Sequence, residues 1–348
     1  MAPELDGRSS AAQIAEGLEA LAGWIAVRRT KAGRVDDDRV QGKRKFADVS
    51  ALSFDAVSRG GAYVTVPFRR AATRALPGLG FCHEETRFSA LTLTQHGSEL
   101  AESAMADTDA RMRLVEWLRN GTKEIQRVPE ALKKTLLPES ATDAERTLVY
   151  QQVLAHEGRR TISGLLHQIP LERLADAQGR KSFLDGLPGA VMRKRLAVCF
   201  AFEDLRAAGL AAAQEVSNAI HDGPLLGAAL AVRTGVRDRF AALEGEAAAL
   251  HRLLPEDAPA EAVAFCAEQG AGAPLATRTL ALCSRIPMIF SVIGDRVDRG
   301  IGYTRELVAD DPSGVPEAEQ DPQLAVPRPI IRLRRLLEEA GERFDHAH

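Results

Sequence analysis

The chain has 348 residues, which is more than a single hydrophobic core usually serves, so we expect two or three domains. Hydrophobic residues make up 45% of the chain and charged residues 27%, the ordinary balance of a soluble globular protein. The formal net charge of −3 excludes a global positive field that draws the protein to nucleic acid, so any such contact must come from local patches.

Composition favours a mainly α fold. Aromatic residues make up only 5% of the chain, and the helix formers Ala and Leu are abundant. The longest apolar stretches, such as "IPMIFSVIG", are far shorter than the ~20 residues that span a bilayer, so no membrane partner is expected. The first residues lack the basic and apolar regions of a signal peptide. We interpret four cysteines as reduced, mostly buried thiols of a cytoplasmic protein: Cys82, Cys199, Cys266 and Cys283.

The first expected element is an amphipathic helix over residues 10–27. Ser9 or Ser10 stands where a side chain can cap its N-terminus. Its apolar stripe has the three- and four-residue spacing of a helix and consists of Ile14, Leu18, Leu21 and Ile25.

A charged segment follows at residues 28–46, "RRTKAGRVDDDRVQGKRKF", with almost no apolar residues. Its acidic run is flanked by two basic ends, Arg28–Lys31 on one side and Lys43, Arg44 and Lys45 on the other. The pattern is typical of a solvated, mobile loop. The alternative is an arm whose lysines and arginines contact phosphates of DNA.

The most organised passage, residues 65–103, begins with a basic helix. Pro67 suits a first helical turn, and Pro77 disfavours helical geometry at Leu76, so we expect the helix to end there. Opposite its apolar face lies a polar face made of Arg69, Arg70, Thr73 and Arg74. An exposed cationic helix of this kind is suited to reach base edges and phosphates in the major groove.

A β-hairpin is expected directly after the basic helix. The segments "GLGFCH" and "FSALTLT" have the pattern of strands, and "EETR" between them is typical of a turn. Thr94 is placed to cap the helix that follows. A hairpin here can rest against the DNA backbone while the basic helix lies in the groove.

The order helix, helix, basic helix and hairpin over residues 48–104 resembles a winged-helix domain. The return "LTLTQHGSELAE", with Thr94 and Gly97, is similar to the pattern that follows the wing in that family. The resemblance implies recognition-helix positions, in contact with double-stranded DNA, for Arg69, Arg70, Thr73 and Arg74.

The chain departs from the winged-helix pattern in two places. Pro77 and Gly78 shorten the recognition helix, and the turn at Glu84 and Glu85 is acidic where a DNA-touching wing carries Lys or Arg. Many winged helices in large assemblies dock proteins instead of DNA. Protein docking by this module is therefore an alternative to DNA contact.

Beyond the hairpin, the sequence is expected to be helical nearly to its end. Apolar periodicity, and a capping-box spacing at Thr142 and Glu145, predict helices at 110–121, 139–157, 192–220, 229–254, 259–268 and 275–295. No alternation of strands and helices indicates a parallel sheet. The expected fold is thus mainly α, with a small β-hairpin in a winged-helix-like N-terminal unit and a helical bundle after it.

The C-terminal part divides into a linker and a basic helix. Residues 309–329 are rich in Pro and acidic residues, which predicts an extended linker. The C-terminal segment is residues 330–348, and its basic helix is expected over residues 328–343. Three arginines share one face of this helix: Arg328, Arg332 and Arg335. Docking of this helix on its own bundle is one interpretation, and binding of a partner subunit is the other. The domains expected before the linker are residues 1–104 and 105–308.

The sequence contains no motif that indicates catalysis or cofactor binding. It lacks a P-loop, a dinucleotide-binding glycine pattern and a nucleophile elbow. His156 and Glu157 lack the second histidine of a zincin, because Arg160 takes its place. Cys82 and His83 are neighbours, but successive side chains on a strand point to opposite faces. We therefore expect no cofactor, no metal and no enzymatic activity.

These observations predict a non-catalytic, cytoplasmic accessory subunit of a multiprotein complex that binds double-stranded DNA. In order and composition, the layout is also similar to helical accessory proteins of bacterial phage-defence islands, which implies an antiviral role. One alternative is a protein–protein interaction scaffold without nucleic-acid contact. Another is an enzyme with an unfamiliar site.

Overall fold

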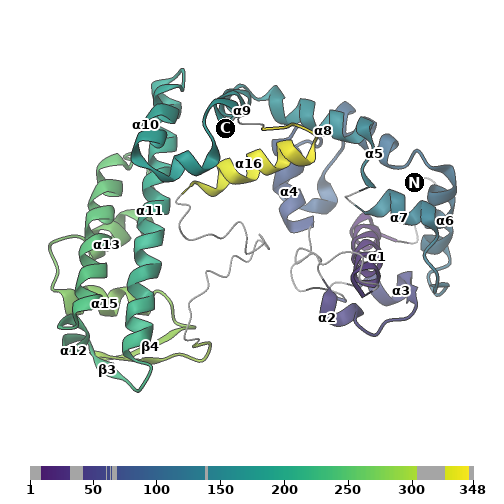
Figure 1. The fold of residues 1–348 in the computed structure, drawn as a ribbon. Coiled ribbons are helices and arrows are strands. Elements are labelled where there is room, and N and C mark those ends of the chain that lie inside the picture. Colours follow the sequence, from purple (N-terminus) through teal and green to yellow (C-terminus); the bar gives the residue numbers. More distant parts are fainter. Residues whose placement is uncertain are drawn as a thin grey trace. The chain divides into compact units, whose positions relative to one another are not determined.

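The structure is a computed structural model that describes residues 9–31, 42–59, 61–62, 64, 69–137, 140–303 and 326–344. Unit 1 comprises Met1–Arg160 with Arg335–Arg343, and unit 2 comprises Thr161–Arg334 with Phe344–His348 (Figure 1). The described residues are mainly helical with small antiparallel sheets, which confirms the expected fold class. The boundary expected after residue 104 falls inside unit 1, and most of the expected linker at 309–329 lies outside the described residues.

The described part of unit 1 combines helices with a short two-stranded sheet. Its elements are α1 (Ala11–Lys31), α2 (Lys43–Phe46), α3 (Phe54–Val57), α4 (Arg69–Gly78), a 3-10 turn at Phe88–Ala90, α5 (Gln95–Ala104), α6 (Thr108–Arg119), α7 (Glu130–Leu136) and α8 (Asp143–Ala155). The strands β1 (Leu52–Ser53) and β2 (Glu124–Ile125) pair antiparallel. In sequence, α9 (Glu157–Gln168) and α16 (Arg328–Glu339) each cross the boundary between the units.

The core of unit 1 surrounds both tryptophans of the chain. Trp24 of α1 and Trp117 of α6 are buried, and their indole N–H groups donate to the carbonyl oxygens of Val49 (3.0 Å) and Leu52 (3.2 Å). The Phe54 ring meets Trp117 edge to face, with 5.5 Å between the ring centroids. Because the polar edges are satisfied, the two large rings can be buried without an unpaired donor.

Three helix starts expected from the sequence are confirmed. At α1, the backbone N–H of Ser10 donates to Gln13 Oε1 (2.9 Å), and the backbone N–H of Gln13 donates back to Ser10 Oγ (3.3 Å). Thr142 forms the capping box expected for α8. Thr94 caps α5 through the backbone N–H of Gly97, at 3.1 Å. Each cap satisfies a backbone donor that the first helical turn leaves free.

The described part of unit 2 combines helices with a three-stranded antiparallel sheet. Its described elements are a 3-10 turn (Leu171–Ala175), α10 (Ala177–Asp185), α11 (Ala190–Ala219), β3 (Leu225–Leu226), α12 (Gly227–Ala231), α13 (Thr234–Leu253), α14 (Ala260–Gln269), α15 (Leu275–Ser284), β4 (Phe290–Ile293) and β5 (Arg296–Arg299). The strand order is β3-β5-β4. Figure 1 shows α11 and α13 lying side by side, and they form the largest helix contact of the unit.

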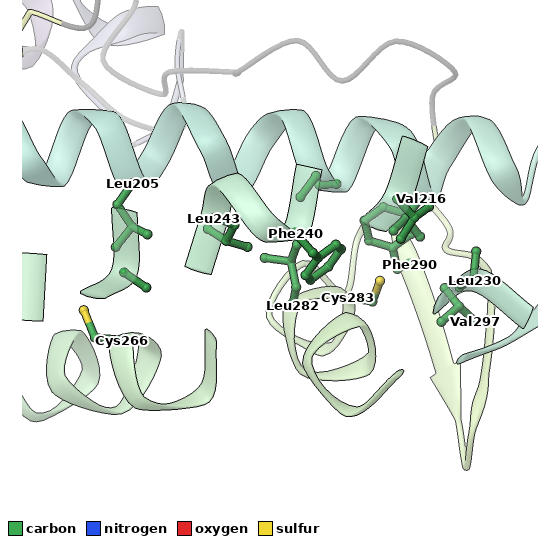
Figure 2. Packing of buried hydrophobic residues seen from close by; sticks show 14 of the residues in the cluster. Leu205, Val216, Leu230, Phe240, Leu243, Cys266, Leu282, Cys283, Phe290 and Val297 are labelled. Atoms are coloured by element: carbon green, nitrogen blue, oxygen red, sulfur yellow. The ribbon is translucent and has the colours of Figure 1, made fainter. Parts of the chain in front are cut away.

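The core of unit 2 fills the space between α11, α13, α15 and the sheet (Figure 2). Its members come from all of these elements and include Leu205, Val216, Phe240, Leu243, Leu282, Phe290 and Val297. Full burial of one such side chain stabilises the fold by roughly 1.5–3 kcal/mol. Burial also raises the pKa of the Cys283 thiol to about 12, so this group packs as a small apolar side chain.

Two of the expected helices of unit 2 are wrong in part. Residues 275–295 form α15 and then β4, because Pro287 lacks the backbone N–H that a helix needs and disfavours helical geometry at Ile286. Residues 229–254 belong to two helices, α12 and α13. The backbone of Arg233 is extended (φ −72°, ψ 128°) and separates them. Val232 lies in this break and is 75% exposed.

A substitution at Gly97 tests how closely α5 packs against the backbone of Phe81. A Cβ atom at this position would collide with the backbone carbonyl oxygen of Phe81, which cannot move as a side chain can. We therefore expect Gly97→Ala to lower the free energy of unfolding of unit 1 by about 3 kcal/mol, as overpacking does. Urea denaturation followed by the fluorescence of Trp24 and Trp117 measures it.

The matched control for that experiment is Gly78→Ala. Nothing lies within 4 Å of a Cβ at Gly78, and alanine has the higher helix propensity. This variant should be as stable as the parent or slightly more stable. Equal destabilisation by both substitutions would contradict the close approach at Gly97.

Candidate nucleic-acid interface

Helix α4 is anchored at its N-terminal end to α1. The guanidinium of Arg69 forms ion pairs with Glu16 and Glu19, the latter at 3.0 Å. The backbone N–H of Arg69 also donates to the Glu19 carboxylate, at 2.8 Å, so a residue of α1 satisfies the first turn of α4. The side chain of Glu16 is only 2% exposed and that of Arg69 is 19% exposed. Most of the Arg69 side chain is therefore withdrawn from solvent.

The C-terminal end of α4 is closed by its own backbone and by neighbouring helices. Gly80 has a left-handed backbone (φ 78°), and the N–H groups of Gly80 and Phe81 donate to the carbonyls of Pro77 and Leu76. The Arg159 guanidinium donates to the carbonyl of Gly78 at 2.5 Å, and the Thr94 hydroxyl donates to that of Gly80 at 2.7 Å.

The helix thus ends at Gly78, two residues beyond the end expected at Leu76. In the last turn, Pro77 lacks only its own backbone N–H, which would donate to the carbonyl four residues earlier. The Gly80 turn supplies bonds that close the helix. The expectation that Pro77 stops the helix is therefore wrong.

Of the four expected contact residues on this helix, two are available to an outside ligand. Arg70 and Arg74 are exposed, and among the described residues neither has an ion-pair or hydrogen-bond partner. Thr73 is half-buried, and its hydroxyl donates to the carbonyl of Arg69 at 2.8 Å. Arg69, expected on the exposed face, is instead an anchor of α4, because the carboxylates of α1 hold its guanidinium.

The expected hairpin is reduced to one antiparallel bridge between Cys82 and Leu93. Backbone hydrogen bonds flank it, from His83 N–H to the Thr92 carbonyl (2.9 Å) and from Thr94 N–H to the Phe81 carbonyl (3.1 Å). The start of the expected return strand is instead the 3-10 turn Phe88–Ala90. The thiol of Cys82 is buried, which raises its pKa, whereas His83 is exposed, so the two side chains diverge as expected.

The second expected basic cluster, Lys43–Lys45, lies on the short helix α2 and not in a loop. The ammonium of Lys45 donates to the carbonyl oxygens of Gly61 (2.7 Å) and Ala62 (2.9 Å), so it ties the following segment to α2. Lys43 is half-buried and interacts within the chain, whereas Arg44 is exposed and has no partner among the described residues. One of the three cations therefore has a clear structural role.

A cationic cleft of about 290 Å3 lies at the C-terminal end of α1 in unit 1. It is lined by Ile25, Arg28, Arg29, Gln126, Arg127, Val128 and Lys133. The Arg28 guanidinium donates to the carbonyls of Ser50 (2.8 Å) and Gln126 (3.0 Å), at the end of the β1–β2 ribbon. Arg28 and Arg29 belong to a basic segment that is evident in the sequence. Arg127 and Lys133 were not expected at a site, because they are distant in sequence from Arg28 and come near it only through the pairing of β1 with β2.

The three expected partner-binding arginines lie on α16. Ile330, Leu333 and Leu337 of this helix are buried, which supports docking of the helix on its own chain. Arg335 pairs with Glu339 one turn later, at 3.0 Å between Nε and Oε1. Arg328 and Arg332 also interact within the chain, so no member of this group is simply free for a partner.

Within the described residues, no group of three or more His, Cys, Asp or Glu side chains is arranged to hold a metal ion. None of the described helices combines the length and apolar character that a membrane span requires. Comparison with protein-family models, curated proteins and solved structures finds no match to this chain.

Proposed function

We propose that unit 1 binds duplex DNA through Arg70 and Arg74 of α4, as a non-catalytic accessory subunit of a larger assembly. The observation that carries this proposal is the contrast between the three arginines of one helix. Arg69 is held by two carboxylates, whereas Arg70 and Arg74 are exposed and have no partner among the described residues.

The spacing of the two exposed arginines suits contacts with a phosphate backbone. Residues four apart lie one above the other on a helix, so Arg70 and Arg74 present adjacent guanidinium groups. The segment Arg69–Gly78 contains no acidic residue that competes for them. Because α4 is fixed at both ends, its backbone loses little additional freedom on binding.

The neighbourhood of α4 supports the winged-helix resemblance as part of this proposal. After α4 the chain forms the antiparallel bridge Cys82–Leu93 and then α5, which Thr94 caps. The acidic pair Glu84 and Glu85 lies exposed between the bridged segments, so we expect few DNA contacts from this turn. In the proposal, phosphate contacts from α4 provide most of the affinity, and sequence specificity is low.

The double variant Arg70→Ala/Arg74→Ala tests the proposal in a titration of the full chain with a short DNA duplex. We expect affinity to fall at least about tenfold, because two charge-assisted hydrogen bonds are lost. The slope of log affinity against log salt should decrease by about two, since each phosphate contact contributes roughly 0.9.

The control is Arg237→Ala/Arg239→Ala, which removes two exposed arginines from α13 of unit 2. It changes the net charge of the chain equally and should leave affinity and salt slope nearly unchanged. Unchanged duplex affinity in the α4 variant, or equal losses in both variants, would remove the proposal.

A second candidate function, protein docking, is favoured by an apolar surface on the sheet of unit 2. Arg296 of β5 lies opposite Leu226 of β3 and Ile293 of β4, so the three side chains share one face. All three are exposed, Ile293 by 74%. Val297 on the other face is buried in the core. The Arg296 guanidinium has no partner among the described residues, and large apolar side chains around such a cation fit a partner protein that presents apolar residues around a carboxylate.

The variant Leu226→Ser/Ile293→Ser tests this second candidate, and Val232→Ser is an apolar control outside the sheet that is as exposed as Ile293. If docking is the function, the parent chain should retain a partner in fixed stoichiometry after nuclease treatment. The sheet variant should lose this partner, and the control should retain it. Sedimentation with mass identification measures both. Retention of that partner by the sheet variant excludes this surface.

A further inference from the structure

The cationic cleft of unit 1 combines three segments that are distant in sequence. Arg28 and Arg29 come from the last turns of α1, Arg127 from the loop after β2, and Lys133 from α7. The pairing of Leu52 with Ile125 brings the β2 end of this loop beside the segment that precedes β1. The fold therefore creates a concentration of charge that no local stretch of sequence contains.

Arg28 is held in place before any ligand arrives. Its Nη1 group donates to two backbone carbonyls, and the guanidinium lies over the Trp24 ring, 4.9 Å from the centroid. None of the described residues uses its Nη2 or Nε donors. A guanidinium that is fixed on one edge and free on the other is preorganised for bidentate contact with an oxyanion.

The cleft carries four cations and no carboxylate among its lining residues. Outside the lining, Glu130 pairs with Lys133 at 2.8 Å. That contact, with smaller contributions from Lys134 and Arg29, lowers the pKa of the Glu130 carboxyl. Arg29 also interacts within the chain, whereas Arg28 donates only to carbonyl oxygens among the described residues. Arg127 is exposed and has no partner among the described residues. The cleft thus has a surplus of positive charge although the chain is acidic overall.

We propose that this cleft is a phosphate-binding site. A phosphate group carries nearly two negative charges and several acceptor oxygens, which matches clustered guanidinium groups better than a single carboxylate does. A volume of about 290 Å3 is at the lower end for ligand sites, and it suits one or two phosphate groups on a small molecule or on a nucleic-acid backbone. The site is formed without residues of α4 and does not depend on the proposed function.

Pyrophosphate is the first probe, titrated calorimetrically into the full chain. We expect one binding event that weakens with added salt. Arg127→Ala and Lys133→Ala should each weaken pyrophosphate binding at least about fivefold, since each removes one cation from the cleft. Lys134→Ala is the control, because this exposed neighbour does not line the cleft, and it should change binding less than about twofold.

A second arm, with a short DNA duplex, identifies the source of the phosphate. If the duplex displaces pyrophosphate and binds Arg127→Ala more weakly, the cleft takes backbone phosphates. If pyrophosphate or a mononucleotide binds without competition from the duplex, the cleft takes a small phosphorylated molecule.

The proposal of a phosphate site is overturned if Arg127→Ala and Lys133→Ala alter neither pyrophosphate binding nor duplex binding. Loss of duplex binding in Arg70→Ala/Arg74→Ala reports on α4 alone, so the two proposals fail separately.

Discussion

The buried ion pair between Arg69 and Glu16 fixes which face of α4 is turned towards α1. Removing a carboxylate from water costs several kcal/mol unless a cation and hydrogen bonds compensate for it. Glu16 meets that condition through Arg69, although its Oε1 atom has no hydrogen-bond partner among the described residues. Helix α4 must therefore keep Arg69 against α1. Since successive helical residues are rotated by about 100°, this orientation turns Arg70 and Arg74 towards solvent.

Helix α1 positions both cationic surfaces of unit 1. Its first half supplies the carboxylates that hold α4, and its last turns supply Arg28 and Arg29 to the cleft. The same helix carries Trp24, whose burial and hydrogen bond fix α1 in the core. Local basic surfaces can thus form in a chain whose formal net charge is −3. In our proposals one surface contacts duplex DNA and the other binds a phosphate group.

Local signals in the sequence predicted much of the fold but little of the site. The stripe from Val236 to Leu250 is buried as its helical spacing requires, and the cap at Thr94 forms because both partners lie within four residues. Periodicity could not reveal that Val292 belongs to a strand, because a short apolar run fits either element. The partners of Arg69, and the meeting of Arg28 with Arg127, depend on tertiary contacts that no local pattern encodes.

A double-mutant cycle between Glu16 and Arg69 measures the central constraint most directly. Stability of Glu16→Ala, Arg69→Ala and the double variant is followed in urea by the fluorescence of Trp24 and Trp117, which both lie in the core of unit 1. We predict that Arg69→Ala costs about 3 kcal/mol, because it leaves the buried Glu16 carboxylate without its cation, and that Glu16→Ala costs less, because Glu19 still pairs with Arg69; the coupling energy should be about 2 kcal/mol. Additive effects, with coupling below about 0.5 kcal/mol, would contradict the account.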